Sequence, residues 1–441
     1  MAESFSFSKD WYYWSQDRLG SLLPLTAFAL KSVFPLSVIW SVSIVQWFYL
    51  LLGLVSFWYF IPNRWMRLLL AVLWFFPFYA LVFHVLPGHP YAAQMAMLGC
   101  SFVCFHQAIL KSKTSYLPLM VLFAVLAIWV SDFSAFIYLS LMLFYRTQIL
   151  SQLKKTIQSK QGIIRLSSAM FVFLVGCAGL YYAKTHTFKD PNYISQLFAN
   201  PEELTHTILT LWSYVVAAAS FEADTAWNSI GFYASIGLFA LSVYKRSIPK
   251  TSWISYFLIT AVLGFIFIML LRWFSINYVM LKYMIPLFLL FWVALFATVH
   301  AKSSLTNASI WISILISISS VFSFRATAAI GPERRISYED LKSIDTNRTR
   351  YFIADYWYSY VLGICNPSKV IITPREQQFV RNGAMKDQVM HSDTIIIVKT
   401  GWLDHSNPDT LMQFGVPLVF TGKVWEEGRF SFAAYLNSNK D

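Results

Sequence analysis

Ten apolar runs follow one another along the chain between residues 38 and 324. A helix needs roughly 20 apolar residues to cross a bilayer, and most of these runs approach that length, although several are short and their boundaries are soft. The pattern therefore predicts a bundle of about ten membrane-spanning helices. The predicted spans are 38–61, 68–86, 91–110, 114–131, 133–146, 166–184, 230–245, 253–271, 280–299 and 309–324.

The composition agrees with a protein whose main solvent is lipid. Hydrophobic residues make up 57% of the chain and charged residues only 13%, too few to cover the surface of a water-soluble protein of this size. Aromatic residues reach 18%, with 17 Trp, which suits rings placed at membrane interfaces. The fold class predicted from the sequence is a polytopic α-helical membrane protein.

The net charge of +12 indicates topology, not a nucleic-acid partner, because Lys and Arg gather in short clusters between apolar runs. If the loop with Arg64 and Arg67 is cytoplasmic, the basic loops at 111–113, 146–165 and 245–250 fall on the same side. This map predicts a multi-pass plasma (inner) membrane protein with both termini outside. The predicted outer segments are 1–37, the turn 87–90, Asp132, the loop 185–229, the loop at Arg272 and the tail after Arg325.

Two segments fit this map less simply. Residues 20–37 are interrupted by Pro24, Lys31 and Pro35, which favours a helix lying in the outer interface over a span. Segment 204–221 is predicted to be interfacial or a half-span, since a full crossing would invert the later topology. An outside N-terminus usually follows a translocating helix, so we expect that a first helix is missing from this chain.

The last part of the chain changes character. From residue 325 to 441 it is charged and polar, with β-type runs that begin at Tyr351, Lys369, Thr394 and Leu418, and a helix-like stretch at 357–362. This alternation predicts a small extracytoplasmic α/β domain, interpreted as a lid or acceptor-binding module. Gly-rich phosphate loops, nucleophile elbows and metal-ligand spacings are absent from its sequence. The predicted organisation is 1–37 first outer loop with interfacial helices, 38–324 transmembrane bundle and 325–441 outer domain.

The cysteines do not indicate a disulfide-bonded or cysteine-ligated metal protein. Of the four cysteines, only Cys365 lies outside the apolar segments, so neither a disulfide framework nor a cysteine metal site is expected.

Carboxylates on the predicted outer face are the first candidates for chemistry. Asp10 and Asp17 lie in a segment rich in Trp and Tyr, where an Asp could act as a general base or bind a divalent cation, the single cofactor that the sequence suggests. The alternative is an aromatic belt with solvated charges. Asp132 lies between two short spans, and carboxylates at such a depth are usually functional, although a plain loop residue would look the same.

Three further residues are weaker candidates for an acceptor contact or a metal ligand. Glu222 and Asp224 end the long outer loop, and His89 follows His84 across the Pro-Gly turn. A lone histidine near an interface is more often structural than a ligand.

A third group is cationic. Arg272, Lys282 and Tyr283 are placed at the outer interface, where Arg forks onto phosphate oxygens and Lys supplies a point charge to a lipid phosphate. Snorkelling toward lipid headgroups is the equally weighted alternative.

Three short motifs carry a family resemblance. They are the acidic aromatic segment around Asp10 and Asp17, the element Lys282-Tyr-Met-Ile-Pro286, and the runs 351–357 and 370–374 near the C-terminus. Together they resemble bacterial members of the GT-C membrane glycosyltransferases, related to dolichyl-phosphate-mannose protein mannosyltransferases and lipid A aminoarabinose transferases. The motifs are distributed along the whole chain, but each motif is short.

The resemblance implies a GT-C-like bundle that moves a sugar from a polyprenyl-phosphate donor to a lipid, glycan or protein acceptor on the outer face. A first-loop Asp would be the base, which maps onto Asp17 or Asp10. This chain departs from the pattern, since isolated Asp10 and Asp17 replace the Asp-Glu pair of the protein mannosyltransferases and the first membrane helix is absent. Either departure would mean altered chemistry or an inactive or truncated chain.

A second class of function stays open. A transporter or polymerase of lipid-linked saccharides, or a noncatalytic membrane scaffold, would share the same span pattern. Transporters often contain internal repeats with broken helices at mid-membrane, and no convincing repeat is present here. Neither the sugar nor the acceptor can be read from the sequence.

Overall fold

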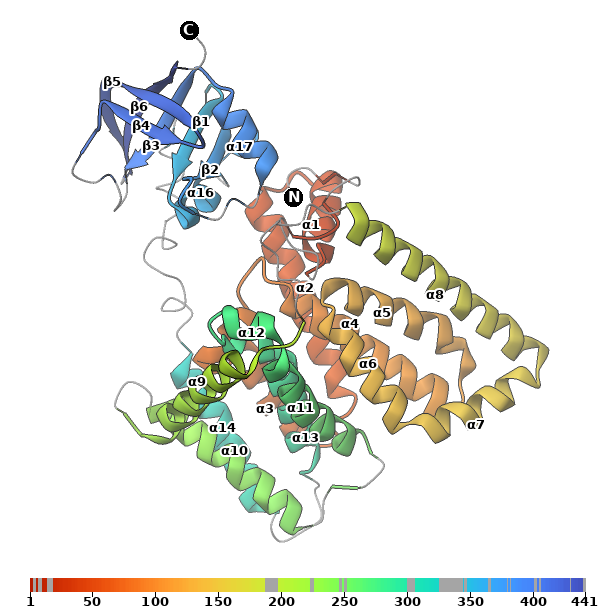
Figure 1. Ribbon diagram of the computed structural model, residues 1–441. Coiled ribbons are helices and arrows are strands. Elements are labelled where there is room, and N and C mark those ends of the chain that lie inside the picture. Colours follow the sequence, from red (N-terminus) through yellow and green to blue (C-terminus); the bar gives the residue numbers. More distant parts are fainter. Residues whose placement is uncertain are drawn as a thin grey trace. The chain divides into compact units, whose positions relative to one another are not determined.

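The computed structural model divides the chain into two compact units, Met1–Ala326 and Thr327–Asp441, each of which is described by itself. The first is helical and the second is built around a sheet (Figure 1). The structure describes residues 1–2, 5–6, 10–13, 19–186, 197–222, 226–245, 248–249, 252–299, 306–324, 344, 347–363, 366–378, 380, 382–399, 403, 406–428 and 430–438.

Apolar helices dominate the first unit. Within its described residues, five helices are long and apolar enough to cross a membrane, or six if a pair bent by 78° counts as one span. The five are α2 (Val38–Trp58), α4 (Tyr91–Phe105) with its π-helical extension (His106–Leu110), α8 (Lys160–His186), α10 (Ala226–Tyr244) and α11 (Trp253–Leu270). A mostly helical unit of this kind is compatible with a membrane protein, while the number of about ten crossings stays a prediction.

Shorter helices fill the remaining predicted spans and the segments around them. They are α1 (Leu22–Val33), α3 (Arg64–Phe75), η1 (Tyr79–His84), η3 (Thr114–Tyr116), α5 (Leu117–Val130), α6 (Phe133–Phe144), α7 (Arg146–Ile157), α9 (Pro201–Ala219), α12 (Arg272–Ile276), η4 (Leu281–Met284), α13 (Ile285–Ala297) and α14 (Thr306–Ser323).

Two predicted spans are broken in the structure. The run 68–86 was expected as one helix, but α3 ends at Phe75 and the chain resumes as η1, because Pro77 lacks an N–H and disfavours helical backbone in the residue before it. The run 133–146 ends at α6, and the chain then turns by 78° into α7. The basic loop expected at 146–165 is therefore largely helical.

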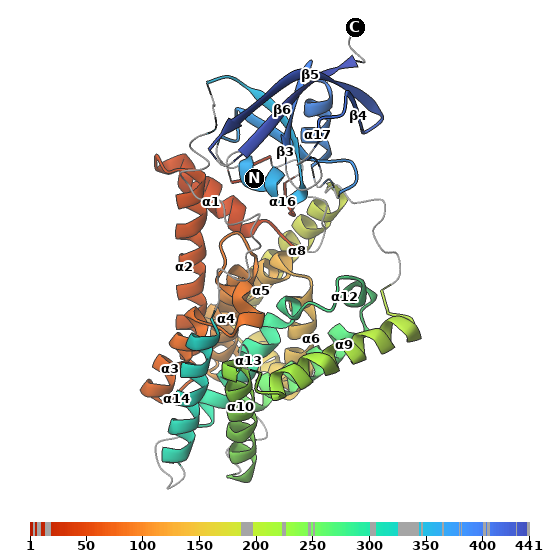
Figure 2. The same ribbon diagram turned by 90° about the vertical axis from the view of Figure 1, so that its left-hand side faces the viewer.

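Small residues let the helices of the bundle approach closely. Helix α4 packs on α2 and on α5, α5 packs on α8, and α10 lies beside α14 in both views (Figures 1 and 2). At the crossing of α2 and α4, a β-carbon added to Gly99 would come within 2.7 Å of the Ser56 Cβ. Glycine is needed there because close-packed interiors leave no room for an extra methyl group.

Two of the predicted basic loops meet at one end of this bundle. Arg165 Nη1 donates to Thr114 Oγ1 at 2.8 Å, and Ser112 Oγ donates to Gln152 at 2.9 Å, which joins the α4–α5 loop to α7 and α8. Tyr59, at the end of α2, accepts a hydrogen bond from Gln107 Nε2 at 2.8 Å. We call this region the basic end; these contacts join the predicted basic loops at 111–113 and 146–165 to the end of α2, and the predicted loop at 245–250 lies partly outside the described residues.

The second unit is a six-stranded mixed sheet with strand order β2-β1-β3-β6-β5-β4. Strands β2, β1 and β3 are parallel, and the others pair antiparallel. Successive side chains of a strand point to opposite faces, so Phe352 joins one apolar cluster with Leu362 of α16 while Ile353 joins a second with Val389 of α17. Its elements are β1 (Arg350–Ala354), α16 (Tyr356–Leu362), β2 (Val370–Pro374), α17 (Gly383–Met390), β3 (Thr394–Lys399), β4 (Thr410–Gln413), β5 (Val416–Glu427) and β6 (Phe430–Asn437).

Three of the four predicted β-type runs fall within strands β1, β3 and β5, the run from Lys369 begins one residue before β2, and the helix-like stretch falls within α16. Strands β4 and β6 and helix α17 were not predicted from the sequence.

Candidate functional site

The N-terminal segment docks against the end of α5. Gly20 N–H donates to the Val130 carbonyl at 3.2 Å, and Trp129 Nε1 donates to the Trp11 carbonyl at 2.9 Å. A β-carbon on Gly20 would lie 2.2 Å from the Trp129 oxygen, so a side chain is excluded at this position. These contacts carry residues 10–13 to the helix end that is followed by Asp132.

Asp132 forms an ion pair that joins two helices. Its carboxylate lies 2.6 Å from the Lys184 Nζ in the last turn of α8, and the two side chains are 38% and 37% exposed. The same Lys184 ammonium lies 5.9 Å from the centre of the Tyr12 ring. The acidic candidate predicted from the sequence is thus accessible, paired with a cation, and close to the N-terminal segment.

Asp10 has a different environment. It is only 5% exposed, and its carboxylate accepts the Ser6 N–H at 2.8 Å, while the Ser21 hydroxyl donates to its backbone carbonyl. A buried carboxylate that closes a local turn supports the fold of the segment more directly than it supports contact with an acceptor.

The turn between η1 and α4 meets the same segment. Tyr13 Oη donates to the Gly88 carbonyl at 3.0 Å, and burial raises the pKa of the Tyr13 hydroxyl, so the group stays a protonated donor. The neighbouring His89 packs against Phe83, with ring centres 4.9 Å apart, and against Tyr91 at 6.4 Å.

Lys282 lies beside this turn. Its ammonium is 5.2 Å from the centre of the Phe83 ring and 5.1 Å from that of Tyr283, at distances where a cation is attracted to a ring face. The Tyr283 ring lies 4.2 Å from that of Trp273. The structure therefore brings three predicted residues together around Phe83, namely His89, Lys282 and Tyr283.

The loop before Lys282 has an unusual backbone. Tyr278 and Val279 have φ angles of 60° and 50°, a region that a β-branched residue rarely adopts. The Val279 side chain is fully buried and its N–H donates to the Phe274 carbonyl at 3.1 Å, which holds the loop in this shape. Strained backbone of this kind is concentrated at functional sites.

Arg272 forms an ion pair with Glu203, which is not among the candidates predicted from the sequence. Its Nε donates to Glu203 Oε1 at 2.8 Å, and Glu203 also accepts the Asn200 N–H in a capping box at the start of α9. The Asn200 N–H and the Arg272 guanidinium together lower the pKa of the Glu203 carboxyl. Arg272 ties α12 to α9 and adjoins Trp273, which packs on Tyr283.

The other predicted residues are placed as follows. Asp17 and Asp224 lie outside the described residues. Glu222 is exposed at the junction of α9 and α10. Within the described part of the chain, no group of three His, Cys, Asp or Glu side chains is arranged to hold a metal ion. A divalent metal therefore stays a prediction from the sequence.

Sequence reasoning missed Lys184, Glu203 and Phe83. Lys184 ends the predicted span 166–184, and Glu203 falls three residues after Asn200 in a capping-box pattern, so local signals marked their positions. The ion-pair partners of Lys184 and Glu203 are Asp132 and Arg272, which lie far away in the sequence, and no local pattern indicates either pairing.

Comparison with known proteins adds no family: no protein-family model matches the chain, and no curated protein matches it. Fold and site together define a mostly helical protein with five or six candidate membrane spans among its described residues and a C-terminal sheet unit.

Proposed function

We propose that this protein transfers a sugar from a polyprenyl-phosphate donor to an acceptor at the end of the helical unit that holds Lys282 and Asp132. One observation supports the proposal above all. The adjacent residues Tyr12 and Tyr13 join two candidate groups, because Tyr12 lies beside the Asp132–Lys184 pair while Tyr13 binds the turn next to His89 and Lys282.

Each group has a chemical role in the proposed reaction. Lys282 binds the donor phosphate, and the Tyr283 and Phe83 rings beside it provide apolar faces on which a sugar can stack. The Asp132 carboxylate removes the proton from an acceptor hydroxyl, and Lys184 holds that carboxylate in place. Asp17 is the second candidate base and rests on the sequence alone.

The proposed step is a single displacement at the anomeric carbon. The acceptor oxygen loses its proton to the carboxylate and forms a bond to that carbon, while the bond from the carbon to the phosphate oxygen breaks. Polyprenyl phosphate leaves with the electron pair, and the ammonium of Lys282 stabilises the added negative charge.

In this proposal the reacting end faces outward. The support is the charge pattern, since two of the predicted cytoplasmic loops, 111–113 and 146–165, meet at the basic end and the candidate residues do not belong to the predicted cytoplasmic loops. Of the two described aspartates near the N-terminal segment, Asp132 suits the role of base better than Asp10, because it is accessible.

The first test measures donor binding. Undecaprenyl phosphate is titrated onto purified protein carrying wild-type sequence, Lys282→Gln or the control Lys155→Gln, which removes an exposed cation from α7. Loss of a charge-assisted phosphate contact weakens binding by about 1.5–3 kcal/mol, so Lys282→Gln should lower the affinity tenfold or more while the control binds normally. Equal affinities would assign Lys282 to headgroup anchoring.

The second test measures transfer. Membranes with matched amounts of wild type, Asp132→Asn, Asp17→Asn, Asp10→Asn or Lys155→Gln receive a radiolabelled polyprenyl-phosphate-sugar donor. Loss of a general base lowers the rate by roughly 10²–10⁴-fold, which we expect for Asp132→Asn or Asp17→Asn. Wild-type rates in both would contradict the enzyme proposal, and movement of intact donor across vesicles without transfer would favour the transporter.

A further inference from the structure

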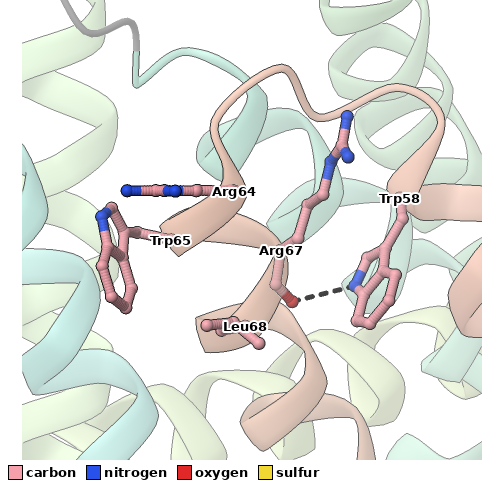
Figure 3. A pocket seen from close by; sticks show the side chains of 5 residues that line it. All are labelled: Trp58, Arg64, Trp65, Arg67 and Leu68. Atoms are coloured by element: carbon pink, nitrogen blue, oxygen red, sulfur yellow. Dashed lines mark hydrogen bonds between the residues drawn. The ribbon is translucent and has the colours of Figure 1, made fainter.

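The basic end holds a cavity that the proposed reaction does not use. It has a volume of about 450 Å³ and is lined by Trp58, Arg64, Trp65, Arg67 and Leu68, from the end of α2 and the first turns of α3 (Figure 3). This volume falls in the range of small-molecule sites. The lining is amphipathic, with two guanidinium groups beside two indole rings and a leucine.

Local bonds orient the cationic part of this cavity. Arg67 Nε donates to the Ile61 carbonyl at 2.7 Å, and Trp58 Nε1 donates to the Arg67 carbonyl at 2.9 Å, as the dashed line in Figure 3 marks. The Arg64 guanidinium lies 5.4 Å from the centre of the Trp65 ring. In Figure 3 the Arg67 guanidinium extends toward the turn between α2 and α3, and the Arg64 guanidinium lies on the other side, beside Trp65.

The electrostatics of the cavity are uncompensated. Among the described residues, neither Arg64 nor Arg67 forms an ion pair, and the first turn of α3 contains no acidic residue. Both arginines also lie at the start of a helix, where the partial positive charge of the helix dipole adds to their own. Two cations at a helix N-terminus favour an anion with several oxygens, and phosphate matches the fork of a guanidinium.

The apolar part of the lining indicates that the anion belongs to a lipid. Trp65 and Leu68 are 56% and 51% exposed, and an apolar stripe runs along α2 toward the cavity. Val55 lies one turn before Trp58 and therefore on the same side of the helix. The exposed residues of the stripe are Trp40, Ile44, Trp47, Phe48, Leu51 and Val55.

We infer that this cavity binds one phospholipid with an anionic headgroup. Arg64 and Arg67 contact the headgroup phosphate, the Trp58 and Trp65 rings flank the glycerol region, and the acyl chains lie along the stripe of α2. The site is independent of sugar transfer, because none of its residues belongs to the proposed reaction.

The test counts bound lipid by native mass spectrometry. The full chain in neutral detergent is titrated with phosphatidylglycerol or with phosphatidylcholine of the same acyl chains. We expect phosphatidylglycerol to bind at least tenfold more tightly than phosphatidylcholine, and Arg64→Gln/Arg67→Gln to abolish this preference. The control Arg146→Gln/Lys155→Gln removes two exposed charges of α7 and should retain it.

A single variant and a competition with glycerol phosphate test the lipid site further. Arg64→Gln alone removes an exposed side chain whose contact within the described part of the chain is with the Trp65 ring, so the variant should fold, and it should weaken phosphatidylglycerol binding several-fold. Glycerol phosphate, which lacks acyl chains, should fail to displace the lipid. Equal binding of both lipids, an unchanged preference in the double variant, or full displacement by glycerol phosphate would each overturn the lipid site.

Discussion

The sharpest test of the sheet unit is the replacement of Arg350 by alanine. Arg350 begins β1 and is only 6% exposed, and its Nη1 donates to both carboxylate oxygens of Glu427 in β5, at 2.9 and 3.0 Å. Its guanidinium also lies 5.5 Å from the centre of the Trp425 ring and 5.8 Å from that of Phe432. The side chain thus links two strands that are far apart in the sequence.

The expected loss of stability follows from the carboxylate that Arg350→Ala leaves without its cationic partner. Glu427 is 17% exposed and would lose its guanidinium partner, although it would keep the hydrogen bond from Trp425 Nε1–H at 2.8 Å. Removing one partner of a buried ion pair costs about 3–5 kcal/mol, because the other charge is left without compensation. Replacing both partners by methionine should cost far less, since two apolar side chains of similar volume leave no charge in the sheet.

Hydrogen–deuterium exchange of the full chain measures this effect locally. Peptides that cover β1, β3 and β6 should exchange roughly 150-fold to several thousand-fold faster in Arg350→Ala, since each 1.4 kcal/mol is a factor of ten. The control is Arg375→Ala, which breaks an ion pair with Asp355 at 2.9 Å whose side chains are about one quarter exposed. Such a pair contributes up to about 1 kcal/mol, so the control should change exchange by about fivefold at most.

Two results would refute the reasoning. If Arg350→Ala accelerated exchange no more than Arg375→Ala, the buried pair would not stabilise the sheet. If the double methionine variant were as unstable as the single alanine variant, the loss would come from packing and not from the abandoned charge.

Three further predictions concern the helical unit and the orientation of the chain. Gly20→Ala should release the N-terminal segment, because its β-carbon would lie 2.2 Å from the Trp129 oxygen; limited proteolysis should then cut before residue 20, whereas Gly179→Ala, with open space around it, should resist like the wild type. The pKa of the Glu203 carboxyl is lowered in the folded chain, so this carboxylate stabilises the start of α9 above the ordinary carboxyl pKa, and the stabilisation is lost as the pH falls through the lowered value. Hydrogen–deuterium exchange of residues 200–207 should show this acid transition in the wild type. An identical transition in Glu203→Gln would contradict the prediction. In a cysteine-free background, a cysteine at Asn347 should react with an impermeant thiol reagent in intact spheroplasts while one at Lys154 reacts only after permeabilisation, and the reverse pattern would invert the predicted orientation.

Much of the element pattern could be predicted from the sequence. Each of the ten apolar runs contains a helix, and each of the four β-type runs overlaps a strand, because burial periodicity and backbone preference are local properties of a segment. The meeting of the basic loops at 111–113 and 146–165 was also predictable, since charge is excluded from apolar helices and collects at their ends. The prediction of one continuous span at 68–86 was wrong, although Pro77 alone indicates a helix break there.

The partners in the candidate site could not be predicted in the same way. Asp132 and Lys184 are 52 residues apart, Arg272 and Glu203 are 69 apart, and Arg350 and Glu427 are 77 apart. Which charge meets which depends on how whole helices and strands pack, and many packings satisfy the same pattern of apolar and polar positions. The sequence by itself determined where helices, strands and charges lie along this chain, whereas only the tertiary structure decided that Asp132 is paired with Lys184, that Lys282 rests on Phe83 near His89, and that two arginines share one cavity with two tryptophans.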